Sequence, residues 1–125
     1  MADSSLMQGK RGLILGVAND HSIAWGIASA VAEHGAELAF TYQGDGFAKR
    51  VKPLAESVGS NIVLPCDVSD DASIDTVFSA VEKEWGSLDF VVHSVAYSDK
   101  DELSGRYVDT TRVNFKLTLD ISCFS

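Results

Sequence analysis

The segment "LILGVANDHSIAWG", from Leu13 to Gly26, decides the fold that this sequence predicts. It begins inside the near-continuous apolar run "GLILGVA", which is typical of a strand buried on both faces of a parallel sheet. It ends in an amphipathic helical pattern, so it predicts a strand, a turn and a helix. Turns of this kind often bind a pyrophosphate, but the usual G-x-G-x-x-G run of glycines is absent.

Gly16 and Ser22 are the residues of this turn that suit an anion. Gly16 ends the strand and turns without the steric clash of a Cβ. Ser22 directly precedes Ile23 at the expected helix N-terminus, where free amides and the helix dipole favour an anion. An ordinary turn, with Ser22 as a plain N-cap, explains the same residues equally well. We expect Gly26, with Ala24 and Ala28, to keep the helix slim, so that it packs closely on the sheet.

Strands and helices alternate along the rest of the chain at the intervals of βαβ units. The further expected strands are "AELAFTY", "NIVLPCDV" and "LDFVVHSVA". Together with the first strand they predict an α/β fold, a doubly wound parallel sheet of the Rossmann type. Ligands of such folds bind beyond the carboxyl ends of the strands, so the residues that follow each strand are the candidates for a site.

The helices carry predictions of their own. We expect a left-handed C-terminal cap at Gly35, an N-cap at Ser69, and a start or a bend of the second helix at Pro53. The last helix should begin near residues 109–110. The expected apolar face of the first helix consists of Ile23, Ile27, Ala30 and Val31. The expected apolar face of the last helix consists of Val113, Leu117 and Ile121.

Composition limits the classes of protein to which the chain can belong. Its 125 residues suffice for one domain, and we expect 1–125 to be the N-terminal portion of a single domain cut short within a helix. Acidic residues outnumber basic ones by 18 to 10, so we expect no nucleic-acid partner. No apolar run approaches the roughly 20 residues that cross a bilayer, so we expect a cytoplasmic protein without a membrane partner. Cys66 and Cys123 form no C-x-x-C pair, so we expect no metal site.

Two strand ends suggest an adenosine site. Gln43 stands where dinucleotide folds often place an acidic ribose ligand, and Asp67 stands where an adenine ring would lie. Each residue also has an ordinary explanation, Gln43 as a solvated strand end and Asp67 as a helix cap. Asp45 would oppose the 2′-phosphate of NADP, whereas the neighbouring basic residues 49–50 would favour it, so the pattern favours NAD only moderately.

Five segments stand in a specific order and spacing and cover nearly the whole chain. They are "GKRGLILGVANDHSIAWGIA", "GAELAFTYQ", "CDVSDDASID", "DFVVHSVAY" and "LDISCFS". Together they resemble the enoyl-acyl-carrier-protein reductases of bacterial fatty-acid synthesis, a divergent branch of the short-chain dehydrogenase/reductases. Several motifs at consistent spacing are far more specific than a single glycine loop.

The resemblance implies a site for NADH. The residues that it implies are, in chain order, Gly16, Ser22, Ile23, Gln43, Asp67, Val68, Ser94, Val95 and Ala96. The first three would lie on the pyrophosphate side and Gln43 near the adenosine ribose. Asp67 and Val68 would frame the adenine, and the last three would line the path toward the nicotinamide. Ser98 matches a position that contacts the acyl substrate in the family.

The resemblance also implies the reaction. A hydride would pass from NADH to the β-carbon of a trans-2-enoyl thioester on acyl carrier protein, and a tyrosine hydroxyl would stabilise the enolate. The family's tyrosine, and the lysine seven residues after it, would lie beyond residue 125, so no catalytic residue is assigned and residues 1–125 alone are expected to be inactive. Tyr42 and Lys49 have this spacing but stand at the adenosine end. A homotetramer is implied as well.

Two alternatives to this function stay open. One is another short-chain dehydrogenase/reductase, which acts on an alcohol or ketone and shares the cofactor half. The other is a truncated nucleotide-binding fragment without catalysis. Asn114 bears on the first alternative, because it matches an asparagine that ordinary short-chain dehydrogenases use in a proton relay. We interpret Asn114 as a structural polar residue.

Overall fold

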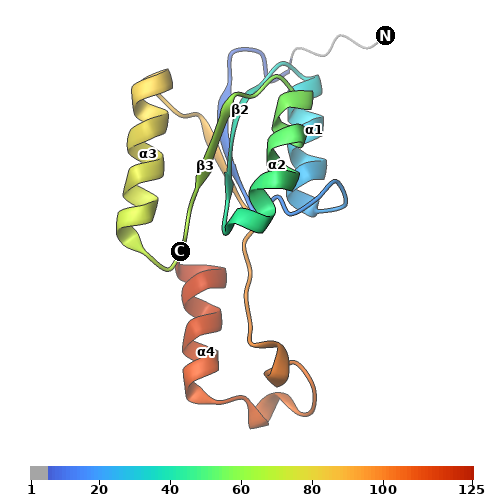
Figure 1. Ribbon diagram of the computed structural model, residues 1–125, viewed down its shortest axis with the longest axis vertical. Coiled ribbons are helices and arrows are strands. Elements are labelled where there is room, and N and C mark those ends of the chain that lie inside the picture. Colours follow the sequence, from blue (N-terminus) through green and yellow to red (C-terminus); the bar gives the residue numbers. More distant parts are fainter. Residues whose placement is uncertain (1–5) are drawn as a thin grey trace. The chain divides into compact units, whose positions relative to one another are not determined.

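Strand β1 (Arg11–Leu15) lies inside a four-stranded parallel sheet in the computed structural model, which describes residues 6–125 (Figure 1). The chain divides into two units, Met1–Ser94 and Val95–Ser125, and the sheet belongs to the first. The other elements of the first unit are, in chain order, α1 (Ile23–Glu33), β2 (Glu37–Tyr42), α2 (Asp45–Ser57), β3 (Ile62–Pro65), α3 (Asp71–Trp85) and β4 (Phe90–His93).

The order of the strands is β3-β2-β1-β4, and every neighbouring pair is parallel. The chain therefore builds outward from β1 to β3 and then adds β4 on the other side of β1. The register pairs Ile14 with Phe40 and Leu15 with His93. This reversal of direction is the mark of a doubly wound sheet, and the predicted fold class is confirmed. The carboxyl ends of all four strands share one edge, which we call the carboxyl edge.

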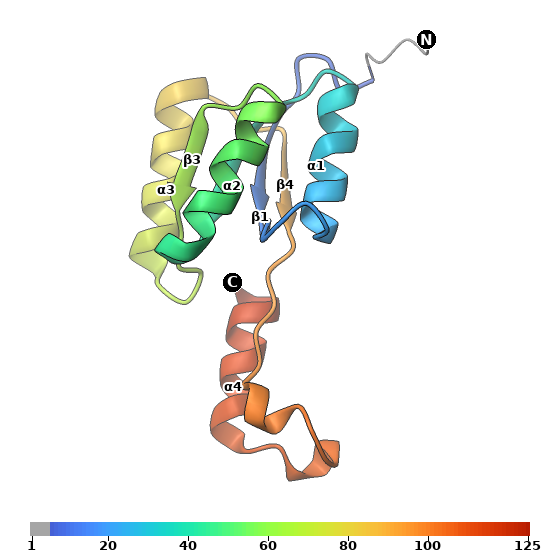
Figure 2. The ribbon, with the colours of Figure 1, turned by 45° about the vertical axis from the view of Figure 1, so that its right-hand side comes forward.

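Helices cover both faces of this sheet (Figures 1 and 2). Helices α1 and α2 pack on one face, and α3 lies on the other. The first face buries a continuous core formed by Ile14, Val17, Ala24, Ala28, Leu38, Phe40, Val51 and Ala55. Burial of a large side chain such as Phe40 stabilises the fold by roughly 1.5–3 kcal/mol. Val77 and Val81 are the buried residues of α3.

The buried face of α1 differs from the predicted one. Ala24 and Ala28 are fully buried, whereas the side chain of Ile23 is 77% exposed and Ile27 is also exposed. The predicted apolar face was therefore wrong for Ile23 and Ile27, whereas the expected close packing of Ala24 and Ala28 is confirmed, because small residues let the helix axis lie close to the sheet. Gly26 was wrongly assigned to this contact, because a Cβ built on it meets nothing within 4 Å.

The helix ends test the predicted caps. Gly35 adopts a φ of +96° and ends α1 with hydrogen bonds from its own amide to Ala32 and from the Ala36 amide to Val31, so the predicted left-handed cap is confirmed. The N-cap of α3 is Asp70, not Ser69, because the Asp70 side chain accepts from the Ala72 amide.

Pro53 lies inside helix α2. The helix begins eight residues earlier, at Asp45, so Pro53 does not start its regular part. Proline lacks an amide proton, and the carbonyl one turn earlier therefore loses its usual helical donor.

Strands β1 and β4 are also joined at the opposite, amino edge of the sheet. The Arg11 amide donates to Asp89 Oδ2 over 2.9 Å, and the Asp89 amide donates to the Arg11 carbonyl over 2.8 Å. The Arg11 guanidinium reaches the Trp85 carbonyl at 2.7 Å and lies 5.8 Å from the centre of the Trp85 ring. This end of β1 is therefore occupied by structural contacts, unlike the carboxyl edge.

The second unit consists of short helical elements. They are the 3₁₀ turns η1 (Lys100–Glu102) and η2 (Tyr107–Asp109), helix α4 (Arg112–Leu119) and the π-helical turn η3 (Asp120–Phe124). Helix α4 begins slightly later than predicted, because Thr111 is its N-cap and accepts from the Asn114 amide at 3.2 Å. Among residues 6–125, no helix combines the length and apolar character that spanning a membrane requires.

The face of α4 that makes contacts within the second unit is polar. A stripe formed by Asn114, Thr118 and Ser122 repeats every fourth residue, and we call it the polar stripe. Asn114 is only 5% exposed, whereas Val113 on the predicted apolar face is 78% exposed. Asn114 Oδ1 accepts from the Asp99 amide, and Ser122 Oγ accepts from the Tyr97 amide. The predicted face was therefore wrong by one residue, because hydrogen bonds to a distant backbone segment decide this contact.

Candidate functional site

The carboxyl edge brings the ends of β1 and β4 together at Gly16 and Ser94. The Ser94 amide donates to the Leu15 carbonyl over 3.1 Å. Gly16 has a φ of +106°, and a Cβ on it would collide with the Ser94 carbonyl oxygen. Strand order reverses between these two strands, and doubly wound folds bind their ligands at such a point. Two of the predicted site residues thus meet where a ligand is expected.

The turn after Gly16 delivers Ser22 and Ile23 to the start of α1. The Asn19 side chain accepts from the His21 amide at 2.8 Å, and the Asn19 carbonyl accepts from the Ser22 hydroxyl at 2.8 Å. Ser22 is the N-cap, but its hydroxyl oxygen lies as far as 3.4 Å from the Trp25 amide. The first two amides of α1, at residues 23–24, have no intrahelical acceptor and suit an anion. Ile23 itself is exposed.

Gln43 and Asp67 line a common hollow of about 280 Å³ at the ends of β2 and β3. The other residues that line it are Tyr42, Gly44, Pro65, Cys66, Ser73 and Thr76. Val68, which was predicted to share in framing a ring, does not line this hollow, and its side chain is only 7% exposed. The tyrosine of the rejected Tyr42 and Lys49 pair belongs to this hollow, at the end of β2.

Asp67 presents an ionised carboxylate to this hollow. Its Oδ1 accepts from the Ser69 hydroxyl at 2.6 Å and from the Ser69 amide at 3.0 Å. These two hydrogen bonds hold the pKa of Asp67 below its ordinary value. A charged carboxylate only accepts hydrogen bonds, so it suits a ligand that carries an amino group.

Cys66 lies beside this carboxylate but is buried. Burial raises the pKa of its thiol, a hydrogen bond with Ser73 lowers it, and the negative charge of Asp67 raises it. Cys66 is therefore a neutral thiol that helps to line the hollow.

Ser73 and Thr76 were missed by the sequence analysis. Both stand on the first turns of α3, and Ser73 Oγ accepts from the Asp67 amide at 2.9 Å. Their positions three residues apart on the first turns of a helix that follows Asp67 were the available signal. This spacing points to the hollow only once the structure shows that the face of α3 with Ser73 and Thr76 is turned toward the strand ends.

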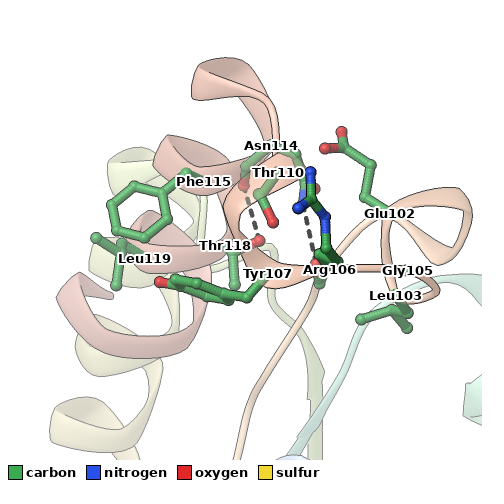
Figure 3. A pocket seen from close by; sticks show the side chains of 11 residues that line it. Glu102, Leu103, Gly105, Arg106, Tyr107, Thr110, Asn114, Phe115, Thr118 and Leu119 are labelled. Atoms are coloured by element: carbon green, nitrogen blue, oxygen red, sulfur yellow. Dashed lines mark hydrogen bonds between the residues drawn. The ribbon is translucent and has the colours of Figure 1, made fainter.

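The remaining predicted residues, Val95, Ala96 and Ser98, belong to the second unit. Ala96 is exposed, and Val95 is half-buried. Ser98 lines a cavity of about 400 Å³ within this unit (Figure 3). The other residues of its lining are Glu102, Leu103, Gly105, Arg106, Tyr107, Thr110, Asn114, Phe115, Thr118 and Leu119. The cavity therefore combines aromatic and aliphatic side chains with polar ones. Among residues 6–125, no group of three His, Cys, Asp or Glu side chains could hold a metal ion.

A parallel sheet that reverses its order between β1 and β4, with a glycine turn, a helix N-terminus and a carboxylate at one edge, defines a dinucleotide-binding fold of the Rossmann type. Comparison with known proteins specifies it further. A family described as enoyl-(acyl carrier protein) reductase matches residues 16–125, and the chain belongs to this family. The family predicted from the sequence is confirmed.

Individual relatives agree with this assignment. The chain is 63% identical, over 98% of its length, to enoyl-[acyl-carrier-protein] reductase [NADH] 2 of Rhizobium meliloti (strain 1021). It covers 46% of that relative, so it spans about half the length of the curated proteins that it matches.

Solved structures of enoyl-acyl-carrier-protein reductases also resemble this chain over nearly its whole length. The enoyl-(acyl-carrier-protein) reductase of Anaplasma phagocytophilum, in complex with NAD, is 60% identical with a TM-score of 0.92, and the match covers 96% of this chain and 46% of that one. The enoyl-acyl carrier protein reductase of Bacillus cereus, with NADP+ and indole naphthyridinone, is 41% identical with a TM-score of 0.92, and the match covers 96% and 48% of the two chains.

Proposed function

We propose that this chain is the cofactor-binding half of an NADH-dependent enoyl-acyl-carrier-protein reductase of bacterial fatty-acid synthesis. The observation that carries this proposal is the family match over residues 16–125, a range that includes the whole carboxyl edge and the cavity of the second unit. The reaction would reduce a trans-2-enoyl thioester on acyl carrier protein to the saturated acyl form. In the same proposal, residues 1–125 are the N-terminal half of one domain of a longer polypeptide.

The proposal assigns a role to each part of the carboxyl edge. Gly16 leaves space beside Ser94, and the free amides at Ile23 and the next residue receive the pyrophosphate. Gln43 binds the adenosine ribose through its exposed side chain, and the Asp67 carboxylate accepts from the adenine amino group. Val68, the next residue in the chain, is buried and would support Asp67 in framing the adenine.

In this proposal the segment that follows β4 binds the substrate and the nicotinamide end of the cofactor. Ser94, Val95 and Ala96 line the path toward the nicotinamide, and Ser98 contacts the acyl substrate. When bound, NADH supplies the hydride that adds to the β-carbon of the enoyl thioester. The chain's own contribution is to bind and orient the two reactants, and the tyrosine and lysine expected from the family resemblance are not among residues 1–125.

We propose NADH and not NADPH as the cofactor because of the negative charge at the start of α2. Asp45 stands in the first turn of α2, next to the hollow formed by Gln43 and its neighbours, and would repel a 2′-phosphate. Lys49 and Arg50 are exposed further along the helix and favour the opposite choice. The relative from Rhizobium meliloti is named for NADH, whereas the Bacillus cereus structure holds NADP+. A competition between NADH and NADPH for the same site decides this point.

A cytoplasmic homotetramer completes the proposal, as the family resemblance implies. Analytical ultracentrifugation of the complete polypeptide that the gene encodes would give its mass in solution. A tetramer is expected, and a monomer at all concentrations would refute this part.

The function is tested by NADH binding, followed by fluorescence, and by reduction of crotonyl thioester, followed by the loss of NADH absorbance. The complete polypeptide should bind and turn over, and residues 1–125 alone should not turn over. If the complete polypeptide binds NADH but oxidises an alcohol or reduces a ketone instead, another short-chain dehydrogenase is the better assignment. If neither form turns over any of these substrates, the chain is only a nucleotide-binding protein.

A variant sharpens the binding test. Asp67→Asn keeps the shape of the side chain but removes its charge, and should weaken NADH about tenfold, as expected for the loss of one hydrogen bond to a charged group. Asp71→Asn is the matched control, because Asp71 lies in the same helix start but does not line the hollow. Equal effects of the two changes would refute the assigned role of Asp67.

A further inference from the structure

Asn114 is the buried polar residue of the second unit, and its carboxamide holds the segment that carries Ser98. Its Oδ1 accepts from the Asp99 amide at 2.9 Å, and its Nδ2 lies 3.1 Å from Ser98 Oγ. A backbone amide can only donate, so the Asp99 contact fixes which end of the carboxamide is oxygen. The nitrogen therefore faces Ser98.

This assignment decides the direction of the Ser98 hydroxyl. The Asn114 nitrogen can only donate, so Ser98 Oγ is the acceptor in this pair. The Ser98 proton must then point elsewhere, and none of residues 6–125 accepts it. Ser98 lines the cavity of about 400 Å³, so the structure holds a hydroxyl donor at the wall of that cavity.

The charged groups around the same cavity are already paired. Both carboxylate oxygens of Glu102 accept from Thr111, one from its amide at 2.6 Å and one from its hydroxyl at 2.8 Å. Arg106 donates to both carboxylate oxygens of Asp109. The Thr118 hydroxyl donates to the Asn114 carbonyl at 2.7 Å. Ser98, by contrast, has a donor to offer.

Figure 3 shows other side chains that line the same cavity. The side chains of Phe115 and Leu119 lie together on one side of the cavity, and Glu102 and Leu103 lie on the other. Asn114 stands at the wall between them. An apolar chain with a carbonyl oxygen fits such a lining, because its hydrocarbon part contacts the first side and its oxygen accepts from a wall hydroxyl.

We propose that Asn114 is a positioning residue, which holds the Ser98 hydroxyl as a hydrogen-bond donor to an acceptor oxygen of the acyl thioester. This inference rests on the proposed reductase function and adds a residue to it. Asn114 does not touch the substrate; it acts by accepting from Asp99 and donating to Ser98. The hydrogen bond from Ser98 to the acyl thioester is equally strong in the bound substrate and in the transition state, so its loss should raise KM.

The test is a double-mutant cycle in the complete polypeptide. Asn114→Asp keeps size and shape and still accepts from Asp99, but its second oxygen captures the Ser98 proton. Ser98→Ala removes the donor directly. Each change should raise KM for crotonyl thioester about fivefold and leave kcat nearly unchanged, and the double variant should be no worse than either single one.

Ser122→Ala is the matched control within the polar stripe. Ser122 holds the neighbouring Tyr97 backbone, at 3.0 Å from its amide, but does not contact Ser98. Its effect should add to that of Ser98→Ala, because it does not act through the same proton. Circular dichroism of each variant checks that the fold is kept.

Additive effects of Asn114→Asp and Ser98→Ala, or an unchanged KM in Asn114→Asp, would overturn the proposal. A wild-type polypeptide that reduces no enoyl thioester would instead refute the reductase function. In that case nuclear magnetic resonance of the isotope-labelled wild type and Ser98→Ala still decides the role of Asn114. One of the two Nδ2 protons of Asn114 should shift in Ser98→Ala, and two unmoved signals would refute the contact.

Discussion

The backbone of Gly16 lies so close to Ser94 that a single additional carbon on residue 16 would strike the Ser94 carbonyl oxygen. The same residue has a φ of +106°, which L-amino acids with side chains rarely adopt. Both constraints fall at the point where β1 and β4 part, beside the proposed pyrophosphate site. In the proposed function, stability and pyrophosphate binding therefore both depend on the absence of a side chain at residue 16.

The first prediction is that Gly16→Ala destabilises the first unit and weakens NADH. The unfavourable φ alone costs roughly 1 kcal/mol, and displacement of Ser94 adds to this cost. Urea unfolding and NADH fluorescence should both register the change. The expected outcome is a lower midpoint together with weaker binding.

Gly26→Ala is the matched control for this change. Gly26 lies within α1 and a Cβ there meets nothing within 4 Å, so alanine should stabilise the helix by about 0.5–1 kcal/mol. If Gly16→Ala is as well tolerated as Gly26→Ala, the close approach to Ser94 has no energetic importance.

The second prediction concerns pH and Asp67. Its pKa lies below the ordinary value of 3.8 because of the Ser69 hydroxyl and amide, so the ionised form stabilises the fold. That contribution is fully present above the ordinary value and is lost as the pH falls below it, through the folded pKa. Ser69→Ala should raise the pKa of Asp67 in a titration followed by nuclear magnetic resonance.

Ser57→Ala serves as the control in this titration. Its hydroxyl donates to the Leu54 carbonyl within α2 and makes no contact with Asp67. An unchanged Asp67 titration in Ser69→Ala would show that the hydroxyl bond of 2.6 Å does not set the ionisation of this carboxyl.

The third prediction is a difference in reactivity between the two cysteines. Cys66 is 6% exposed, and its burial raises the pKa of the thiol, whereas Cys123 is exposed. The thiolate is the reactive form, so a thiol reagent should modify Cys123 first in the folded chain. Cys66→Ala assigns the signal in mass spectra, and equal rates at both sites in the absence of urea would contradict the described burial.

The fourth prediction concerns the start of α4. Thr111→Ala removes the acceptor for the Asn114 amide and one of the two donors to Glu102, and should cost about 1 kcal/mol in the stability of the second unit. Thr111→Ser keeps the hydroxyl and should restore most of this loss. Hydrogen exchange at the first amides of α4 is the direct readout. Identical protection in the alanine and serine variants would exclude a capping role.

The order of the elements and the class of the fold followed from the sequence because they depend on local patterns. Apolar runs such as "GLILGVA" mark buried strands wherever they stand, and Gly35 and Gly86 mark helix ends through their freedom at positive φ. These signals need no knowledge of distant neighbours. Gly86, with a φ of +76°, ends α3 in the same way as Gly35 ends α1.

Contacts between distant segments were harder to predict. In α1 the sheet selects Ala24 and Ala28 because they allow a close approach, although Ile23 has more surface to bury. In α4 the backbone of 97–99 selects Asn114 in place of its apolar neighbour Val113. Hydrophobicity alone favours the larger residue in both cases, so the apolar face predicted from it was wrong in both helices, although the close packing expected of Ala24 and Ala28 was right.

The positions of the candidate site residues were predictable where these residues directly follow strands. Gly16, Gln43, Asp67 and Ser94 are placed at the carboxyl edge by strand ends alone. Ser73 and the Asn114 to Ser98 contact come from helices, whose rotation about their own axes the strand ends do not determine.

The pairing of β1 with β4 also has a consequence for the order of assembly. Arg11 and Asp89 are separated by 78 positions in the sequence, whereas β1 meets β2 and β2 meets β3 after a single intervening helix. Closing the longer loop costs more chain entropy, and a chain emerging from the ribosome can pair β1, β2 and β3 before β4 has been made. We therefore expect a nascent chain to gain its proposed affinity for NADH only once the fourth strand has joined the first three, well before the remaining half of the proposed longer polypeptide has been made.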